Sequence, residues 1–151
     1  ALFLSFFVMT PTLSEIESEA IAPYRSEEIT STEALTRSAD ILKRFMVRQT
    51  RDSDLEYFLG LAGEGPTKRT ELSVHVVLPA FVLSELRTAF QMGFLIFVPF
   101  ILVDFLIASI LMAMGMMMMP PIVISLPLKL LLFVLVDGWY LVVSSLLQSF
   151  H

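Results

Sequence analysis

The chain has 151 residues, enough for one domain with a core, but 56% of them are hydrophobic, only 17% are charged, and the mean hydropathy is +0.77. This balance is unusual for a soluble globular protein, so lipid or a large hydrophobic assembly must cover the excess apolar surface. The net charge of −5 argues against a nucleic-acid partner, because phosphate binding needs clustered Lys and Arg, and the absence of cysteine excludes disulfides and thiolate sites.

The first segment, residues 1–13, is apolar but short. Its run ALFLSFFVMT before Pro11 is about half as long as the ~20 apolar residues that a membrane-spanning helix needs. The run opens on Ala1 and lacks both the basic start and a convincing cleavage site of a signal peptide. We expect the tail of an N-terminally truncated membrane helix, with a signal-peptide core as the alternative.

Residues 14–78 form a polar insert between apolar segments, with twelve acidic residues against eight basic ones. A periodic apolar run after Ser31 and Thr32 predicts one helix, and a second helix is expected to begin at a cap on Asp52. The stretch GLAGEGPT, residues 60–67, should then interrupt the helical pattern. It lacks the Gly-Lys-Ser/Thr and the preceding strand of a phosphate-binding loop, so we interpret it as a plain loop.

Residues 79–151 predict an apolar helical hairpin that turns at residues 115–121, GMMMMPP. As one helix, the first arm up to the turn would be ~60 Å long, about twice the ~30 Å thickness of the hydrocarbon core. It cannot be one simple span, and we expect a kink or break at Pro99, helped by Gly93. The second arm should run from about residue 122 to residue 150, with Trp139 available as an interfacial aromatic residue.

The hairpin turn has an unusual composition. Gly115, Pro120 and Pro121 enclose four methionines, Met116, Met117, Met118 and Met119, whose side chains are flexible and polarizable. Repeated around a symmetric ring, such a loop would make a soft apolar plug. Composition alone favours the simpler interpretation, in which these residues face lipid or fill a core at the tip of the hairpin.

Five ionisable residues lie in or beside the apolar half: Glu85, Arg87, Asp104, Lys129 and Asp137. Each costs about 2.5–3.5 kcal/mol at the centre of a membrane helix on insertion scales, so each should be paired, protonated or reached by water. If the turn centres near Pro120, Asp104 is level with Asp137, and Lys129 faces no acid within its own hairpin.

Lys129 therefore needs a partner from farther away or an interface. Along a continuous helix Glu85 lies ~40 Å from the level of Lys129, so either the first arm folds back sharply near Pro99 or a neighbouring subunit supplies the acid. Lys129 thus favours oligomerisation, and snorkelling of its long side chain to an interface remains open as the alternative.

Asp104 and Asp137 at one level suggest a second function, a proton- or cation-coupled transporter of small solutes. We favour the simpler interpretation that both carboxylates bond to neighbouring backbone or to Trp139, and we count Arg87, Asp104, Asp137 and Trp139 as buried polar residues. The two histidines, His75 and His151, lie far apart in the sequence, so we expect no metal site, no cofactor and no enzyme activity.

Two long segments carry a family resemblance: residues 79–94, PAFVLSELRTAFQMGF, and residues 127–139, PLKLLLFVLVDGW. Together with ILMAMGMMMMPP and the upstream FMVRQTRDSDLEYF, they resemble the FliP/SctR family of type III secretion export-gate proteins over nearly the whole chain. The ending SSLLQSF is more similar to flagellar members than to injectisome members. Members of that family carry a signal sequence and a further apolar helix upstream, which fits the expected truncation.

The resemblance implies an all-α, membrane-class subunit of a closed export pore in the flagellar basal body, at the bacterial inner membrane, through which unfolded flagellar proteins pass. It implies as partners further FliP copies, FliQ and FliR, with FlhB and the basal-body ring beside them. It also implies that Met116 to Met119 form a gasket, that Glu85 and Lys129 pair between subunits, and that the insert, residues 14–78, lies on the periplasmic side.

Overall fold

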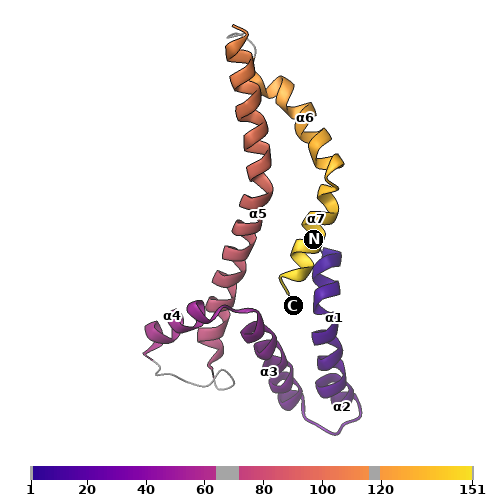
Figure 1. The fold of residues 1–151 in the computed structure, drawn as a ribbon. Coiled ribbons are helices and arrows are strands. Elements are labelled where there is room, and N and C mark those ends of the chain that lie inside the picture. Colours follow the sequence, from indigo (N-terminus) through magenta and orange to yellow (C-terminus); the bar gives the residue numbers. More distant parts are fainter. Residues whose placement is uncertain (1, 64–71, 116–119, 151) are drawn as a thin grey trace. The chain divides into compact units, whose positions relative to one another are not determined.

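All the described elements are helical, which confirms the expected all-α class (Figure 1). The computed structural model describes residues 2–63, 72–115 and 120–150, and none of these forms a strand. In chain order the helices are α1 (Leu2–Ile16), the π-helical segment η1 (Glu17–Ile21), α2 (Ala22–Arg25), α3 (Ser31–Gln49), α4 (Asp52–Ala62), α5 (Val74–Ala113), α6 (Pro121–Leu135) and α7 (Gly138–Gln148). The chain divides into two compact units, Ala1–Thr88 and Ala89–His151, and α5 contributes to both.

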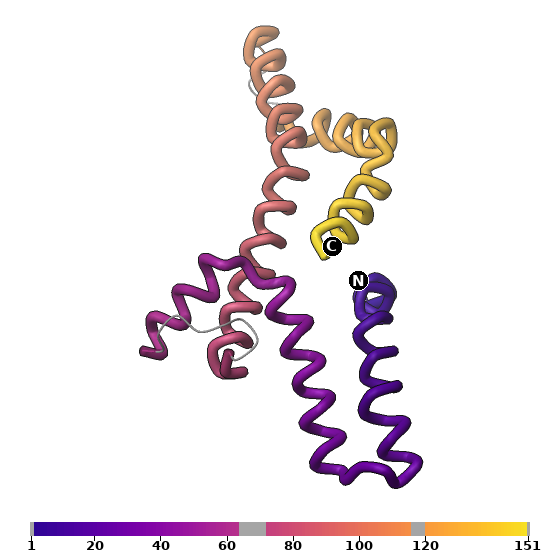
Figure 2. The backbone as a smooth tube through the Cα atoms, turned by 60° about the horizontal axis from the view of Figure 1, so that its bottom comes forward, coloured from indigo at the N-terminus to yellow at the C-terminus, as the bar shows by residue number. Residues whose placement is uncertain are grey.

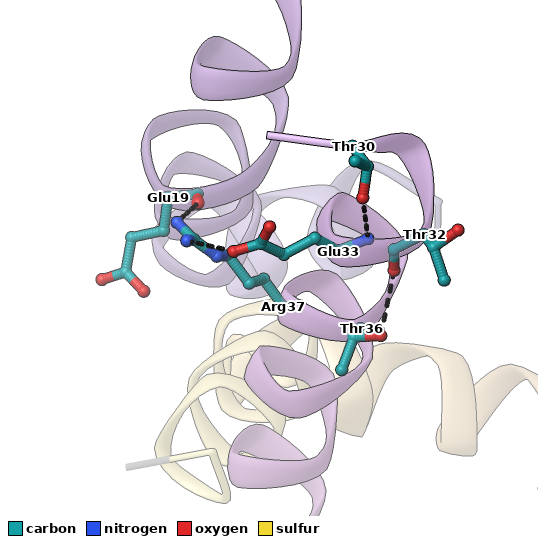
Figure 3. Close-up of polar contacts among 6 residues, drawn as sticks. All are labelled: Glu19, Thr30, Thr32, Glu33, Thr36 and Arg37. Carbon is teal, nitrogen blue, oxygen red and sulfur yellow. Dashed lines mark hydrogen bonds and ion pairs between the residues drawn. The ribbon is translucent and has the colours of Figure 1, made fainter. Parts of the chain in front are cut away.

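In the first unit, α3 returns along the arm formed by α1, η1 and α2, as both backbone views show (Figures 1 and 2). The π-helical turn has a local cause. In an α-helix the carbonyl of Glu19 would accept from the backbone nitrogen of Pro23, which carries no hydrogen. The backbone hydrogen bonds there span five residues instead of four, and the Ala22 N–H donates to the Glu17 carbonyl. The Glu19 carbonyl instead accepts from Arg37 Nη1 at 3.2 Å (Figure 3).

The first predicted helix of the insert is confirmed as α3. Its cap is Thr30, one residue before the expected signal, because Thr30 Oγ1 accepts from the backbone nitrogen of Glu33 at 3.3 Å (Figure 3). The Glu33 carboxylate in turn accepts from Arg37 Nη2 at 2.7 Å. The same arginine therefore supports both the start of α3 and the freed carbonyl of η1.

The second predicted helix is confirmed as α4, but the expected cap on Asp52 is wrong. The carbonyl of Arg51 accepts from the backbone nitrogen of Asp54 at 3.1 Å, which makes Arg51 the N-cap. Asp52 is the first helical residue, where its negative charge complements the positive end of the helix dipole. After α4, Gly63 adopts a left-handed conformation with φ of 68°, as is common for glycine past a helix end, and residues 64–71 lie outside the described residues.

The core of the first unit lies where α3, α4 and the start of α5 meet. Its buried members are Val47, Leu55, Leu72, Val77 and Ala80. Beside them the ring of Phe45 packs edge-on against that of Phe81, with the ring centroids 6.2 Å apart. Each large apolar side chain buried here contributes roughly 1.5–3 kcal/mol. The polar insert is thus anchored on the first turns of the apolar arm.

In the second unit, α5 continues unbroken through Gly93 and Pro99, so the expected break is wrong. Pro99 leaves the carbonyl of Leu95 without its usual donor, but propagation of a long helix on both sides outweighs one missing bond. The sharp fold-back that could have brought Glu85 to Lys129 is thereby excluded, while a kink at Pro99 remains a prediction. By length and composition α5 could cross a membrane, with a mean hydropathy of 2.7 over its most apolar window.

The second arm is bent, although the sequence suggested one continuous arm. Its two helices, α6 and α7, meet at 61° (Figure 2), and only together are they long and apolar enough for a span. Pro127 is accommodated inside α6, as expected. At the bend Asp137 has φ of 50°, which few residues other than Gly adopt readily, and a Cβ on Gly138 would lie 2.3 Å from the ring of Phe133.

Gly138→Ala should therefore destabilise this bend by about 1–3 kcal/mol, the usual cost of forcing an extra carbon into a packed site. Trp139 is the single tryptophan of the chain and packs edge-on against Phe133, with ring centroids 5.3 Å apart, so tryptophan fluorescence reports on the bend directly. The control is Gly93→Ala, because nothing lies within 4 Å of a Cβ there. An unchanged fluorescence midpoint of urea unfolding in Gly138→Ala would show that the close approach is not a constraint.

Candidate functional site

One ion pair joins the two arms of the apolar hairpin. Lys129 Nζ on α6 lies 2.5 Å from Asp104 Oδ2 on α5, and the side chains are 20% and 44% exposed. The ring contact between Phe100 and Phe133, with centroids 6.3 Å apart, joins the same two helices. The expectation that Lys129 faces no acid within its own hairpin is therefore wrong.

The error lies in the assumed centre of the turn. Helix α5 ends at Ala113 and α6 begins at Pro121, so the turn centres a few residues before Pro120. Asp104 precedes the end of α5 by almost as many residues as Lys129 follows the start of α6, which brings the two side chains to one level. Asp137 lies at the bend of the second arm, so counting residues along a straight arm does not apply to it.

A buried hydroxyl accompanies this pair, and sequence reasoning missed it. Ser125 lies on α6, one turn before Lys129, and is fully buried. Its hydroxyl donates to the carbonyl of Ile122 at 3.5 Å and lies close to the Asp104 carboxylate. The signal in the sequence is the four-residue spacing of Ser125 and Lys129, which places both on one face of an otherwise apolar helix.

The polar residues expected to be buried are not buried within a single chain. Arg87, Asp137 and Trp139 are exposed, and Asp104 is half-buried. The reason is that the apolar half lies largely uncovered, with only 11% of the most apolar window of α5 buried inside the chain. Burial of these four residues in an assembly stays a prediction.

The structure describes the two ends of the expected turn. Gly115 follows α5 with φ of 73°, and Pro120, in an extended conformation, caps α6 ahead of Pro121. The four methionines, Met116 to Met119, lie outside the described residues, so the gasket stays a prediction. Glu85 is half-buried on the part of α5 that belongs to the first unit, and its pairing with Lys129 between subunits is likewise untested.

A second polar cluster, within the first unit, joins the segments FMVRQTRDSDLEYF and PAFVLSELRTAFQMGF. Arg87 Nη2 lies 3.1 Å from Asp54 Oδ1, and the Asp54 side chain is only 3% exposed. The backbone nitrogen of Arg51 donates to Ser84 Oγ at 3.2 Å, and Arg51 Nη2 donates to Thr88 Oγ1 at 3.0 Å. Polar contacts therefore fix the start of α4 on α5.

Within this cluster one buried acceptor stays unsatisfied, since Asp54 Oδ2 has no hydrogen-bond partner among the described residues. Sequence reasoning counted Asp54 only as part of the polar insert and did not single out Ser84. The signal was available as spacing, because Arg51 and Asp54 share one helical face, as do Ser84, Arg87 and Thr88. Within the described ranges, no group of three or more His, Cys, Asp or Glu is placed to hold a metal ion.

Comparison with known proteins gives one consistent result. The chain matches the FliP family over residues 1–146. It is 53% identical to the flagellar biosynthetic protein FliP of Bacillus subtilis, over 99% of this chain and 68% of that protein. The proteins of the same name from Pectobacterium carotovorum and Cereibacter sphaeroides are 51% and 52% identical, over 99% of this chain and 58% and 50% of theirs. The chain thus spans between half and about two thirds of the length of these relatives.

Proposed function

The chain belongs to the FliP family, and from this we propose that it is a pore-forming subunit of the flagellar type III protein export gate. Several copies would assemble with FliQ and FliR, beside FlhB and the basal-body ring, and unfolded flagellar proteins would cross the bacterial inner membrane through the assembly. The insert, residues 14–78, would lie on the periplasmic side. The observation that carries the proposal is the family match over residues 1–146, which covers the insert and nearly all of the hairpin.

The surface of the second unit supports assembly. Large apolar side chains on the later part of α5 are exposed, among them Phe90, Phe94, Leu95 and Phe105. Contiguous apolar surface of this kind marks a protein or membrane interface rather than a solvated face. In a ring of copies this surface would be covered by neighbouring chains, by partner proteins and by lipid.

The proposed gate uses two features of the hairpin. Met116 to Met119 would converge from several copies as a gasket, since unbranched thioether side chains fill irregular gaps and re-pack around changing occupants. Glu85 of one copy would pair with Lys129 of the next. The contact between Lys129 and Asp104 does not prevent this, because an ammonium group has three donors and can serve two carboxylates.

A charge exchange tests the proposed assembly. Lys129→Glu should impair recovery of a multimer with FliQ and FliR, because it sets two acids against each other at the subunit boundary and a third, Asp104, within the chain. Adding Glu85→Lys should restore part of the multimer, measured by co-purification and by the mass of the complex. The control is Lys43→Glu, which alters the partner of the exposed Asp40 on α3, a helix that is not part of the hairpin. If the second change restores no multimer although the inserted monomer is present at its normal level, the pairing between subunits is wrong.

A transporter of small solutes remains the rival interpretation, and it needs Asp104 free to bind and release a proton or cation. In this chain Asp104 is engaged by Lys129 instead. The rival also predicts pH-dependent uptake that requires neither FliQ nor FliR and disappears in Asp104→Asn. The export gate predicts no such uptake.

A further inference from the structure

Lys129 is a charged residue within an apolar helix of the hairpin. It is flanked by Leu128, Leu130 and Leu131 inside α6, and its side chain is largely buried. An ammonium group in such a segment must be neutralised or must reach an interface before the helix can enter a membrane. A partner on another subunit cannot serve that purpose, because it arrives only when the assembly forms.

Asp104 is available earlier, because it belongs to the same chain. Its carboxylate contacts the Lys129 ammonium directly, and the buried hydroxyl of Ser125 lies beside the same carboxylate. The pair has no net charge, and a charge-assisted hydrogen bond of this kind is stronger than a neutral one. The contact also connects α5 to α6, which diverge from the turn in Figure 1.

We propose that Asp104 is a positioning residue that neutralises Lys129 within the single chain, so that the hairpin is stable in the membrane before neighbouring copies join. Asp104 keeps the Lys129 ammonium at the boundary between the arms and leaves donors free for a later acceptor. Only the identity of that later acceptor, Glu85 of a neighbour, rests on the proposed function. The neutralisation itself rests on the contact within this chain.

The experiment uses the full chain expressed without FliQ and FliR, and the monomer is separated by size from any assembly of copies before it is measured. Asp104→Asn should lower the amount of membrane-inserted monomer, and its half-life after synthesis is stopped, by on the order of tenfold. Glu85→Gln should leave both unchanged. The matched control is Asp137→Asn, which neutralises an exposed acid of the same hairpin and keeps a residue type that tolerates positive φ.

Exchange of the two charges separates neutralisation from a packing defect. The double change Asp104→Lys with Lys129→Asp restores the opposite charges and should recover most of the monomer lost in Asp104→Asn. A normal monomer level in Asp104→Asn, an equal loss in Glu85→Gln, or no recovery in the exchanged chain would each overturn the proposal. If Asp104→Asn lowers the monomer but the unchanged chain never assembles with FliQ and FliR, the export-gate function fails and the role of Asp104 stands.

Discussion

Arg87→Leu should lower the free energy of unfolding by about 3 kcal/mol, the largest loss we expect from a single change in the first unit. The substitution removes the one described cation in contact with the buried Asp54 carboxylate, whose second oxygen already lacks a donor. Breaking a buried pair typically costs 3–5 kcal/mol, and we place this pair at the lower end because Arg87 is itself 46% exposed.

Two further variants show whether the uncompensated carboxylate causes that loss. Adding Asp54→Leu to Arg87→Leu removes both charges and should recover most of the stability, since two apolar groups can replace a buried pair at little cost. Arg25→Leu removes the partner of Glu17 in an exposed pair and should cost less than about 1 kcal/mol. Chemical unfolding of the purified full chain gives all three values. A double variant as unstable as Arg87→Leu alone would contradict the explanation.

Local patterns in the sequence predicted the helices well. Ser31 and Thr32 ahead of a periodic apolar run, the start near Asp52 and the Gly and Pro residues around the methionines all mark helix ends through short-range chemistry. Each was placed within a residue or two, because capping and turn preferences act over a single helical turn. The all-α class followed from the same signals together with the long apolar runs.

Contacts between residues far apart in the sequence were harder to predict. The hairpin register was wrong by a few residues, which was enough to assign Lys129 no partner although Asp104 contacts it. The bend at Asp137 and Gly138 was missed, since a single Asp-Gly pair inside an apolar run is a weak signal compared with the bend that it produces. Asp54 and Arg87 are far apart in the sequence, and only the packing of α4 on α5 brings them together.

Substitution of the four methionines of the turn tests whether they seal the proposed pore. Replacing all four residues, Met116 to Met119, by Ala should leave the assembled complex intact and raise its ion leakage several-fold. Alanine removes most of each side chain, so apolar loops that meet in a ring would leave a gap that water and ions can enter. The matched control replaces Met112 and Met114 by Ala. These two residues are exposed at or just after the end of α5, and their replacement should leave the leakage unchanged.

The most direct measurement is the single-channel conductance of the complex that co-purifies with FliQ and FliR, reconstituted in a lipid bilayer. The export-gate account predicts a closed pore for the unchanged chain and for the Met112 and Met114 variant, and a leaking pore for the variant of Met116 to Met119. An assembled complex whose conductance is the same in all three would contradict the proposal that these methionines seal the pore.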